Sequence, residues 1–67
     1  MDILRYADVA RKCRVSVMTI RRWATDPDYA HLNFEKPIPL GDNSVGFDEA
    51  GIDSWLEARA AARNSAA

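Results

Sequence analysis

Cysteine and histidine are almost absent from this sequence of 67 residues, which contains only Cys13 and His31. A lone cysteine excludes an internal disulfide, and a small domain without one is typical of a reducing intracellular compartment. One cysteine and one histidine are also too few for a Cys/His metal site or a nucleophile–histidine pair. The sequence also lacks a glycine-rich phosphate-binding loop and a paired acid and base that could act in catalysis. We therefore expect a protein that is not an enzyme and that binds no metal, cofactor or small-molecule ligand.

Long apolar runs are absent as well. The sequence has no stretch of about 18 apolar residues that could span a membrane, and its first five residues do not begin a secretory signal. The chain is short, so we expect residues 1–67 to form one small domain. Together these features predict a soluble cytoplasmic protein.

The net charge of −1 combines segments of opposite charge. Residues 1–24 contain six basic and two acidic side chains, for a net charge of +4. Residues 25–57 contain one basic and eight acidic side chains, for a net charge of −7, and residues 58–67 add two arginines. Because salt screens charges beyond about 8–10 Å, phosphate binding depends on the local charge. The first third of the chain is therefore expected to face a polyanion.

Two short amphipathic helices are predicted in this basic first third. The apolar positions 6, 9, 10 and 13 follow the i, i+3, i+4, i+7 pattern of one helical face. After a two-residue interruption, the Ser16 side chain can cap a second helix by accepting a backbone N–H two or three residues later. That helix ends near Ala24, because the residue before Pro27 avoids helical geometry. The result is a helix-turn-helix from Val9 to about Ala24.

The rest of the sequence predicts a hairpin and a third helix. Residues 25–35 form a connection with one short helical turn at most. Two prolines in residues 36–40 exclude a helix but suit an edge strand, residues 41–44 favour a turn, and residues 45–47 can return as a second strand. Asp48 then caps a helix with an apolar face. The order of elements predicts a mainly α fold with a small β-hairpin, the winged helix-turn-helix.

The aromatic residues indicate where the core lies. Trp23 is on the inward face of the second helix with Ile20, and Trp55 is on the apolar face of the third helix, so both are expected in the core. Phe34 is expected to anchor the connection before the hairpin. Gly51 is unusual in the first turn of a helix, where glycine costs about 1 kcal/mol relative to alanine.

The outward side chains of the second helix are the candidate DNA-binding residues. A protruding helix start fits the major groove, which is about 12 Å wide, and its free N–H groups favour a phosphate. Arg21 and Arg22 can each reach a guanine edge or hold a phosphate, and Val17 and Met18 suit a thymine methyl group. Thr19 suits a phosphate or the interior. The further candidates lie at the start of this helix and on the first helix and the turn: Ser16, Arg14, Arg11 and Lys12.

Motifs along most of the chain resemble those of a known family. They are Val9-Ala10, Val15-Ser16, Thr19-Ile20-Arg21-Arg22-Trp23, Phe34-Glu35-Lys36-Pro37-Ile38, Leu40-Gly41, Phe47-Asp48 and Ile52-Asp53-Ser54-Trp55-Leu56. On these motifs the chain resembles, over about residues 4–63, the AlpA-type regulators, which belong with phage and mobile-element excisionases in the MerR-like winged-helix group. The resemblance implies a protein that binds double-stranded DNA with its second helix in the major groove and its hairpin near the minor groove.

The resemblance implies one of two roles for such a protein. One is the regulation of transcription on prophages and integrative elements. The other is that of an excisionase, a recombination directionality factor that bends DNA and has an integrase as its partner. We favour excision, because a minimal binder without an effector domain needs only to position or bend DNA.

The hairpin departs from the family pattern. Family members usually carry an arginine or lysine in the turn or the returning strand, where this chain has Asp42, Asn43, Ser44 and Gly46. Since phosphate would repel Asp42, we expect a weak contact through Asn43 and Ser44, or packing of the hairpin against a neighbouring protomer. The basic first third and the acidic middle would complement each other in head-to-tail self-association along DNA.

A protein-interaction module is the alternative class of function. The acidic surface of residues 25–57 suits a protein partner, as in an anti-repressor or an integrase adaptor. The two hypotheses differ in what they require of Arg21 and Arg22. Only DNA binding depends on the charge of these two side chains.

Overall fold

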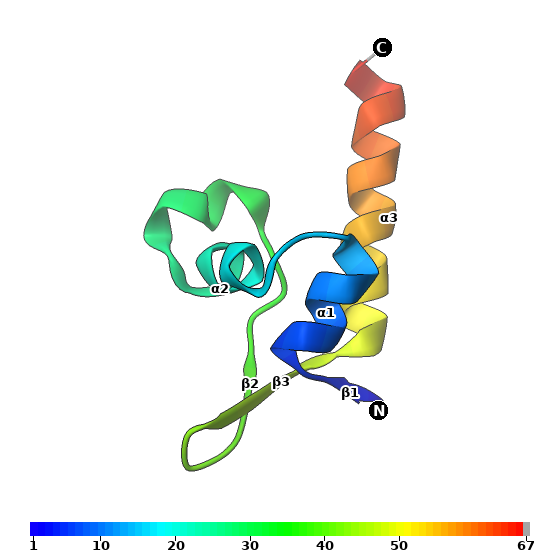
Figure 1. The fold of residues 1–67 in the computed structure, drawn as a ribbon. Coiled ribbons are helices and arrows are strands. Elements are labelled where there is room, and N and C mark those ends of the chain that lie inside the picture. The colour runs from blue at the N-terminus through cyan, green and yellow to red at the C-terminus, as the bar shows by residue number, and fades with distance from the viewer. Residues whose placement is uncertain (67) are drawn as a thin grey trace.

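The computed structural model describes residues 1–66, in which three α-helices stand at one side of a small antiparallel sheet (Figure 1). In chain order the elements are β1 (Ile3–Leu4), α1 (Tyr6–Cys13), α2 (Val17–Thr25), the 3₁₀ helix η1 (Pro27–Leu32), β2 (Ile38–Gly41), β3 (Ser44–Asp48) and α3 (Glu49–Ala66). The hairpin of β2 and β3, here called the wing, extends beside the helix-turn-helix of α1 and α2. The predicted fold class, a mainly helical winged helix-turn-helix with a small hairpin, is confirmed.

The two ends of α1 determine how it meets α2. At its start, the backbone N–H of Arg5 donates to Asp8 Oδ2 at 3.0 Å. At its end, Arg14 adopts the left-handed backbone conformation, with a φ of 62°. The N–H of Val15 then donates to the carbonyl of Ala10 at 3.0 Å. A left-handed residue at this position ends the helix sharply and redirects the chain within two residues.

The sheet has three strands in the order β1–β3–β2. Pro39 in β2 lies opposite Val45, and β2 is an edge strand, as the prolines in and just before it predict. On the other side of β3, Leu4 of β1 lies opposite Phe47. The sequence predicts the hairpin but not β1, because two residues are too few to show the alternation of a strand. β1 forms because β3 offers it an open edge.

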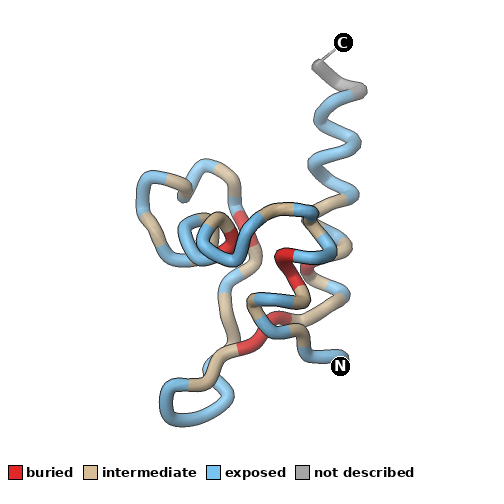
Figure 2. Tube along the Cα trace, in the orientation of Figure 1, coloured by how far each residue is buried: buried red, intermediate tan, exposed pale blue. Residues whose placement is uncertain are grey.

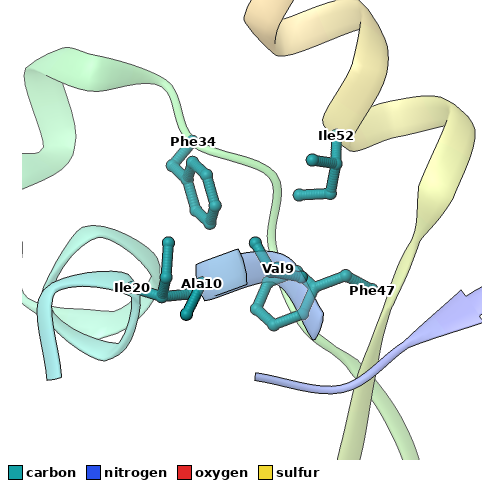
Figure 3. Close-up of a cluster of buried hydrophobic side chains, with 6 residues drawn as sticks. All are labelled: Val9, Ala10, Ile20, Phe34, Phe47 and Ile52. Carbon is teal, nitrogen blue, oxygen red and sulfur yellow. The ribbon is translucent and has the colours of Figure 1, made fainter. Parts of the chain in front are cut away.

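The core lies where α1, α2, α3 and β3 meet (Figure 3). Its buried side chains are Val9, Ala10, Ile20, Phe34, Phe47 and Ile52. Trp23 and Trp55, which the sequence places in the core, are partly buried and pack against this cluster, with ring centroids 5.6 Å apart. The indole N–H of Trp55 donates to the carbonyl of Leu32 at 2.8 Å, which links η1 to α3. η1 lies where the sequence predicts a short helical turn between α2 and the wing, and with six residues it is longer than one turn.

The start of α3 is packed against other residues, and its end is exposed to solvent. Asp48 Oδ1 accepts a hydrogen bond from the N–H of Ala50 at 3.3 Å, so the predicted cap is present. The Glu35 carboxylate lies against Gly51, in the space that a Cβ at this position would occupy. A Cβ at position 51 would therefore displace the flexible end of the Glu35 side chain. Residues 57–63 are all exposed, and this part of α3 projects from the rest of the molecule (Figures 1 and 2).

Replacing Gly46 with alanine is expected to destabilise the fold. Gly46 is buried in β3, where an added Cβ would collide with the Ile3 side chain and lie 3.1 Å from Leu40 Cδ1. Overpacking of this kind costs about 1–3 kcal/mol, and each kcal/mol lowers the Tm of a domain this small by roughly 4–8 °C. Thermal unfolding followed by circular dichroism measures the change. Gly41→Ala is the matched control, because nothing lies within 4 Å of its Cβ position and its φ is not positive. Equal midpoints for the two variants would contradict the close packing around Gly46.

Candidate nucleic-acid interface

Ser16 determines where α2 begins. Its side-chain oxygen accepts a hydrogen bond from the backbone N–H of Thr19 at 3.1 Å, and the hydroxyl oxygens of the two residues lie 2.9 Å apart. This is the cap that the sequence predicts, and Thr19 is its partner. The backbone N–H groups of Val17 and Met18 are donors without an acceptor inside the helix. The start of α2 is therefore well defined and open to an anion.

The outward face of α2 is apolar at its start and basic in the next turn. Val17 and Met18 are 38% and 55% exposed. Arg21 and Arg22 are also exposed, whereas Ile20 between them and the helix start is completely buried. The side chains that the sequence places outward therefore lie together on the surface.

The two arginines of α2 point in different directions. At about 100° per residue, Met18 and Arg22 lie opposite the buried Ile20, and Arg21 lies to one side. The guanidinium carbon of Arg21 is 4.9 Å from the centroid of the Tyr6 ring, a cation–π contact with α1. Within residues 1–66, Arg22 takes part in no ion pair. Arg22 thus extends outward, whereas Arg21 is held against α1.

A cleft of about 540 Å³ separates α2 from the wing. Its lining consists of Arg5, Tyr6, Ala7, Val17, Arg21, Asn43 and Val45. Arg5 Nη1 donates to the carbonyl of Val45 at 3.5 Å, so this guanidinium lies beside the wing. Arg5 is the candidate residue that the sequence does not single out, because its partner lies 40 residues away. The sequence does contain one indication of such a residue, which is the absence of a basic side chain from the hairpin turn. A phosphate near the wing then needs a cation from another element.

The wing tip presents an amide to this cleft. Asn43 is exposed and has a left-handed backbone, with a φ of 58°. Ser44 is half-buried at the start of β3. Asn43, and not the neighbouring Asp42, lines the cleft. Of the two predicted wing residues, Asn43 is therefore the one that lines the cleft with α2, and neither Ser44 nor the Asp42 carboxylate is part of the cleft lining.

Arg11 and Arg14 flank the start of α2 on its other side. With Val17 they line an open groove of about 650 Å³ between α1 and α2. Arg11 also forms an ion pair with Asp8, one turn earlier on α1. The Arg11 side chain is 73% exposed, and an exposed pair of this kind contributes little to stability. Both arginines are therefore positioned for a phosphate beside the helix start.

Lys12 faces α3 instead. Its Nζ lies 2.8 Å from Asp53 Oδ1 and 3.4 Å from Glu49 Oε2. The hydrogen bond with Asp53 raises the pKa of Lys12 above its usual value, partial desolvation opposes the rise, and the bond with Glu49 adds to it. Burial also raises the pKa of the neighbouring Cys13 thiol, against the effect of the Lys12 charge. Lys12 links α1 to α3, so a phosphate would compete with two carboxylates for it.

The chemistry available on this surface is hydrogen bonding and positive charge. Within residues 1–66, no three His, Cys, Asp or Glu side chains come close enough together to hold a metal ion. None of the helices in the described part of the chain has the length and apolar character needed to cross a membrane. The groups that the surface offers a ligand are those of α2, the arginines Arg5, Arg11 and Arg14, and the wing.

A family model matches most of the chain. The family is described as prophage CP4-57 regulatory protein (AlpA), and the match covers residues 2–60. No curated protein and no solved structure matches the chain. The matched range includes β1, α1, α2, the wing and the packed part of α3, so it contains the whole candidate interface.

Replacing Ser16 with alanine is expected to destabilise the start of α2. Loss of a serine cap costs about 0.5–2 kcal/mol, because the N–H of Thr19 loses its acceptor. Ser16→Asp keeps an acceptor at the cap and is expected to retain most of the stability. Urea unfolding measures the differences, with Ser54→Ala at an exposed position of α3 as the matched control. If Ser16→Ala were as stable as this control, the cap would not be what holds the helix start.

Proposed function

Because the chain belongs to the AlpA family of prophage regulatory proteins, we propose that it binds a specific sequence of duplex DNA with α2 in the major groove. The observation that carries the proposal is the outward face of α2, where Met18 and Arg22 are exposed above the buried Ile20. The start of α2 is supported by α1 and flanked by the wing. Helix-turn-helix proteins place a helix in the major groove with the same arrangement of supporting elements.

The charge around α2 supports contact with a polyanion. Five arginines of the first third are exposed: Arg5, Arg11, Arg14, Arg21 and Arg22. Two of the acidic residues of α3, Glu49 and Asp53, are engaged with Lys12. Salt screens the field of each charge over a short distance, so phosphate binding depends on the charges near α2. The negative net charge of the whole chain therefore does not prevent phosphate binding at α2.

We assign base recognition to the outward face of α2. Arg22 extends from this face and has the donor geometry to bind guanine O6 and N7 in bidentate fashion. Val17 and Met18 offer apolar surface to thymine methyl groups. Arg21 is the second arginine within reach of the groove, and its position beside Tyr6 separates its role from that of Arg22.

Contacts with the DNA backbone are assigned to the groups around α2. They are the helix start with Ser16 and Thr19, the basic side chains of Arg11, Lys12 and Arg14, and the wing residues Asn43 and Ser44. Among these, Lys12 contributes least, because it must leave Asp53 and Glu49 to reach a phosphate. The wing contact is weak, since its tip carries Asp42 and no cation.

The same contacts serve two regulatory uses of DNA. Promoter control requires occupancy of a site, whereas excision requires a bent site and an integrase as partner. We favour excision, because a recognition helix and a wing that enter adjacent grooves favour bending of the duplex. The bend angle of the bound DNA, measured with and without an integrase, separates the two uses.

Two adjacent sites are expected to bind two protomers cooperatively. The basic residues 1–24 of one protomer and the acidic residues 25–57 of the next attract each other when they bind head to tail, and added salt weakens this attraction. Titration of duplexes with one and with two sites, at several salt concentrations, measures the effect. Equal affinity per site at every salt concentration would exclude head-to-tail association.

Replacing Arg22 with alanine is expected to weaken binding to the preferred sequence by about 1–3 kcal/mol and to relax the preference at one base pair. The reason is the loss of a bidentate donor to a guanine. Competition between single-base variants of the site, at constant salt, measures both effects.

Arg63→Ala is the matched control for Arg22→Ala. It removes an equal charge from the exposed end of α3 and should leave affinity and preference unchanged. An Arg22→Ala variant with unaltered affinity would contradict recognition by α2. Failure of the wild-type chain to bind any duplex would favour instead a protein partner on the acidic surface of residues 25–57.

A further inference from the structure

We propose that the cleft between α2 and the wing binds one backbone phosphate of the DNA between the guanidinium groups of Arg5 and Arg21. Arg21 then contributes affinity, and the reading of bases on α2 falls to Arg22. This inference rests on the proposed function, because it assigns a role to one part of the same surface.

The cleft joins two cations from separate elements with an amide from a third. Arg5 precedes α1, Arg21 belongs to α2 and Asn43 forms the wing tip, and all three line the same space of about 540 Å³. None of the described side chains that line it is acidic. Two positive charges and an amide donor, with no carboxylate among them, form a site for an anion. Val17 at the start of α2 also lines the cleft, so this site is continuous with the groove-binding face.

Arg5 is positioned by contacts that leave most of its donors free. Its backbone N–H is bound to Asp8 at 3.0 Å, and Nη1 makes a long hydrogen bond to the carbonyl of Val45 at 3.5 Å. A guanidinium has five N–H donors arranged in a planar fork. One of these contacts β3, and the others remain available to the oxygens of a phosphate.

Arg21 is positioned by the ring of Tyr6. Its guanidinium carbon lies 4.9 Å from the ring centroid, a contact that directs the side chain toward the cleft. To reach a base edge, Arg21 would have to leave this ring. Arg22 lies on the opposite side of α2 from Ile20, and among the described residues it has no cation–π contact or ion pair to break. The two neighbouring arginines therefore differ in function because they differ in their surroundings.

This assignment explains how a wing without a basic tip can stand next to DNA. The wing has Asp42, Asn43 and Ser44 where a cation would be expected. Arg5 reaches β3 from the start of α1 and brings a positive charge to the same place. The cation that meets the phosphate beside the wing thus comes from a segment 40 residues earlier in the chain.

The test compares variants on the preferred duplex, which is obtained by selection from random sequences. Binding is measured over a range of salt for Arg5→Ala, Arg21→Ala, Arg22→Ala and the control Arg63→Ala. Arg5→Ala and Arg21→Ala are each expected to weaken binding to all sequences by a similar factor of about 3 to 10. Each is also expected to reduce the slope of log K against log salt by about 1. A changed base preference is expected for Arg22→Ala alone.

A neutral phosphate analogue locates the contact. A methylphosphonate at the bound position is expected to weaken binding by the wild-type chain, to have a smaller effect on Arg5→Ala, in which Arg21 alone still faces the phosphate, and to have no further effect on the double variant Arg5→Ala/Arg21→Ala. Arg5→Lys, which keeps the charge, should keep most of the salt slope. Thermal unfolding verifies that the variants are folded.

Two results would overturn the assignment while DNA binding by α2 stands. One is a slope of log K against log salt for Arg5→Ala that equals the slope of the wild-type chain. The other is an altered base preference in Arg21→Ala. If the wild-type chain bound no duplex at all, the proposed function itself would fail, and the phosphate site with it.

Discussion

Phe34 packs between the elements that carry the binding surface. Its ring centroid lies 4.8 Å from that of Trp55 in α3, 5.7 Å from Trp23 in α2 and 5.9 Å from Phe47 in β3, all in edge-to-face arrangements. Each such pair contributes about 0.5–1.5 kcal/mol beyond the burial of its area. Since folded proteins are stable by only about 5–15 kcal/mol and small domains bury little surface, these contacts are a large part of the total. The orientation of α2 relative to the wing therefore depends on a residue from the segment that connects them.

The same aromatic packing extends from the core to the surface. Phe47, one of the partners of Phe34, also contacts Tyr6 edge-on, with 5.3 Å between the ring centroids. Tyr6 in turn supports the guanidinium of Arg21. A charged side chain at the surface is thus held by the core through a series of rings. This arrangement limits the conformational entropy that Arg21 would lose on binding an anion.

Local patterns predict most of this fold, and contacts between distant segments account for what they miss. The helices, the Ser16 cap and the hairpin follow from periodicity, capping and turn residues within a few positions of one another. Phe34 anchors the connection before the wing, as its sequence position predicts, but its aromatic partners in α2, β3 and α3 are far apart in the chain and no local pattern identifies them. In the candidate site, helical periodicity predicts which side chains of α2 are exposed. The position of Arg5 beside the wing and the ion pair of Lys12 with Glu49 depend on partners 40 and 37 residues away, which no local pattern reveals. The contacts assigned to DNA stay predictions.

Glu35 and Gly51 occupy one shared space at the start of α3. The carboxylate of Glu35 lies where the Cβ of any other residue at position 51 would be, near the positive end of the helix dipole. A methyl group at position 51 would expel the carboxylate into solvent, and a short side chain at position 35 would leave the space open for that methyl group. Substitutions at these two positions are therefore coupled. Among homologous chains we expect them to covary, with glycine at position 51 accompanying a long acidic residue at position 35.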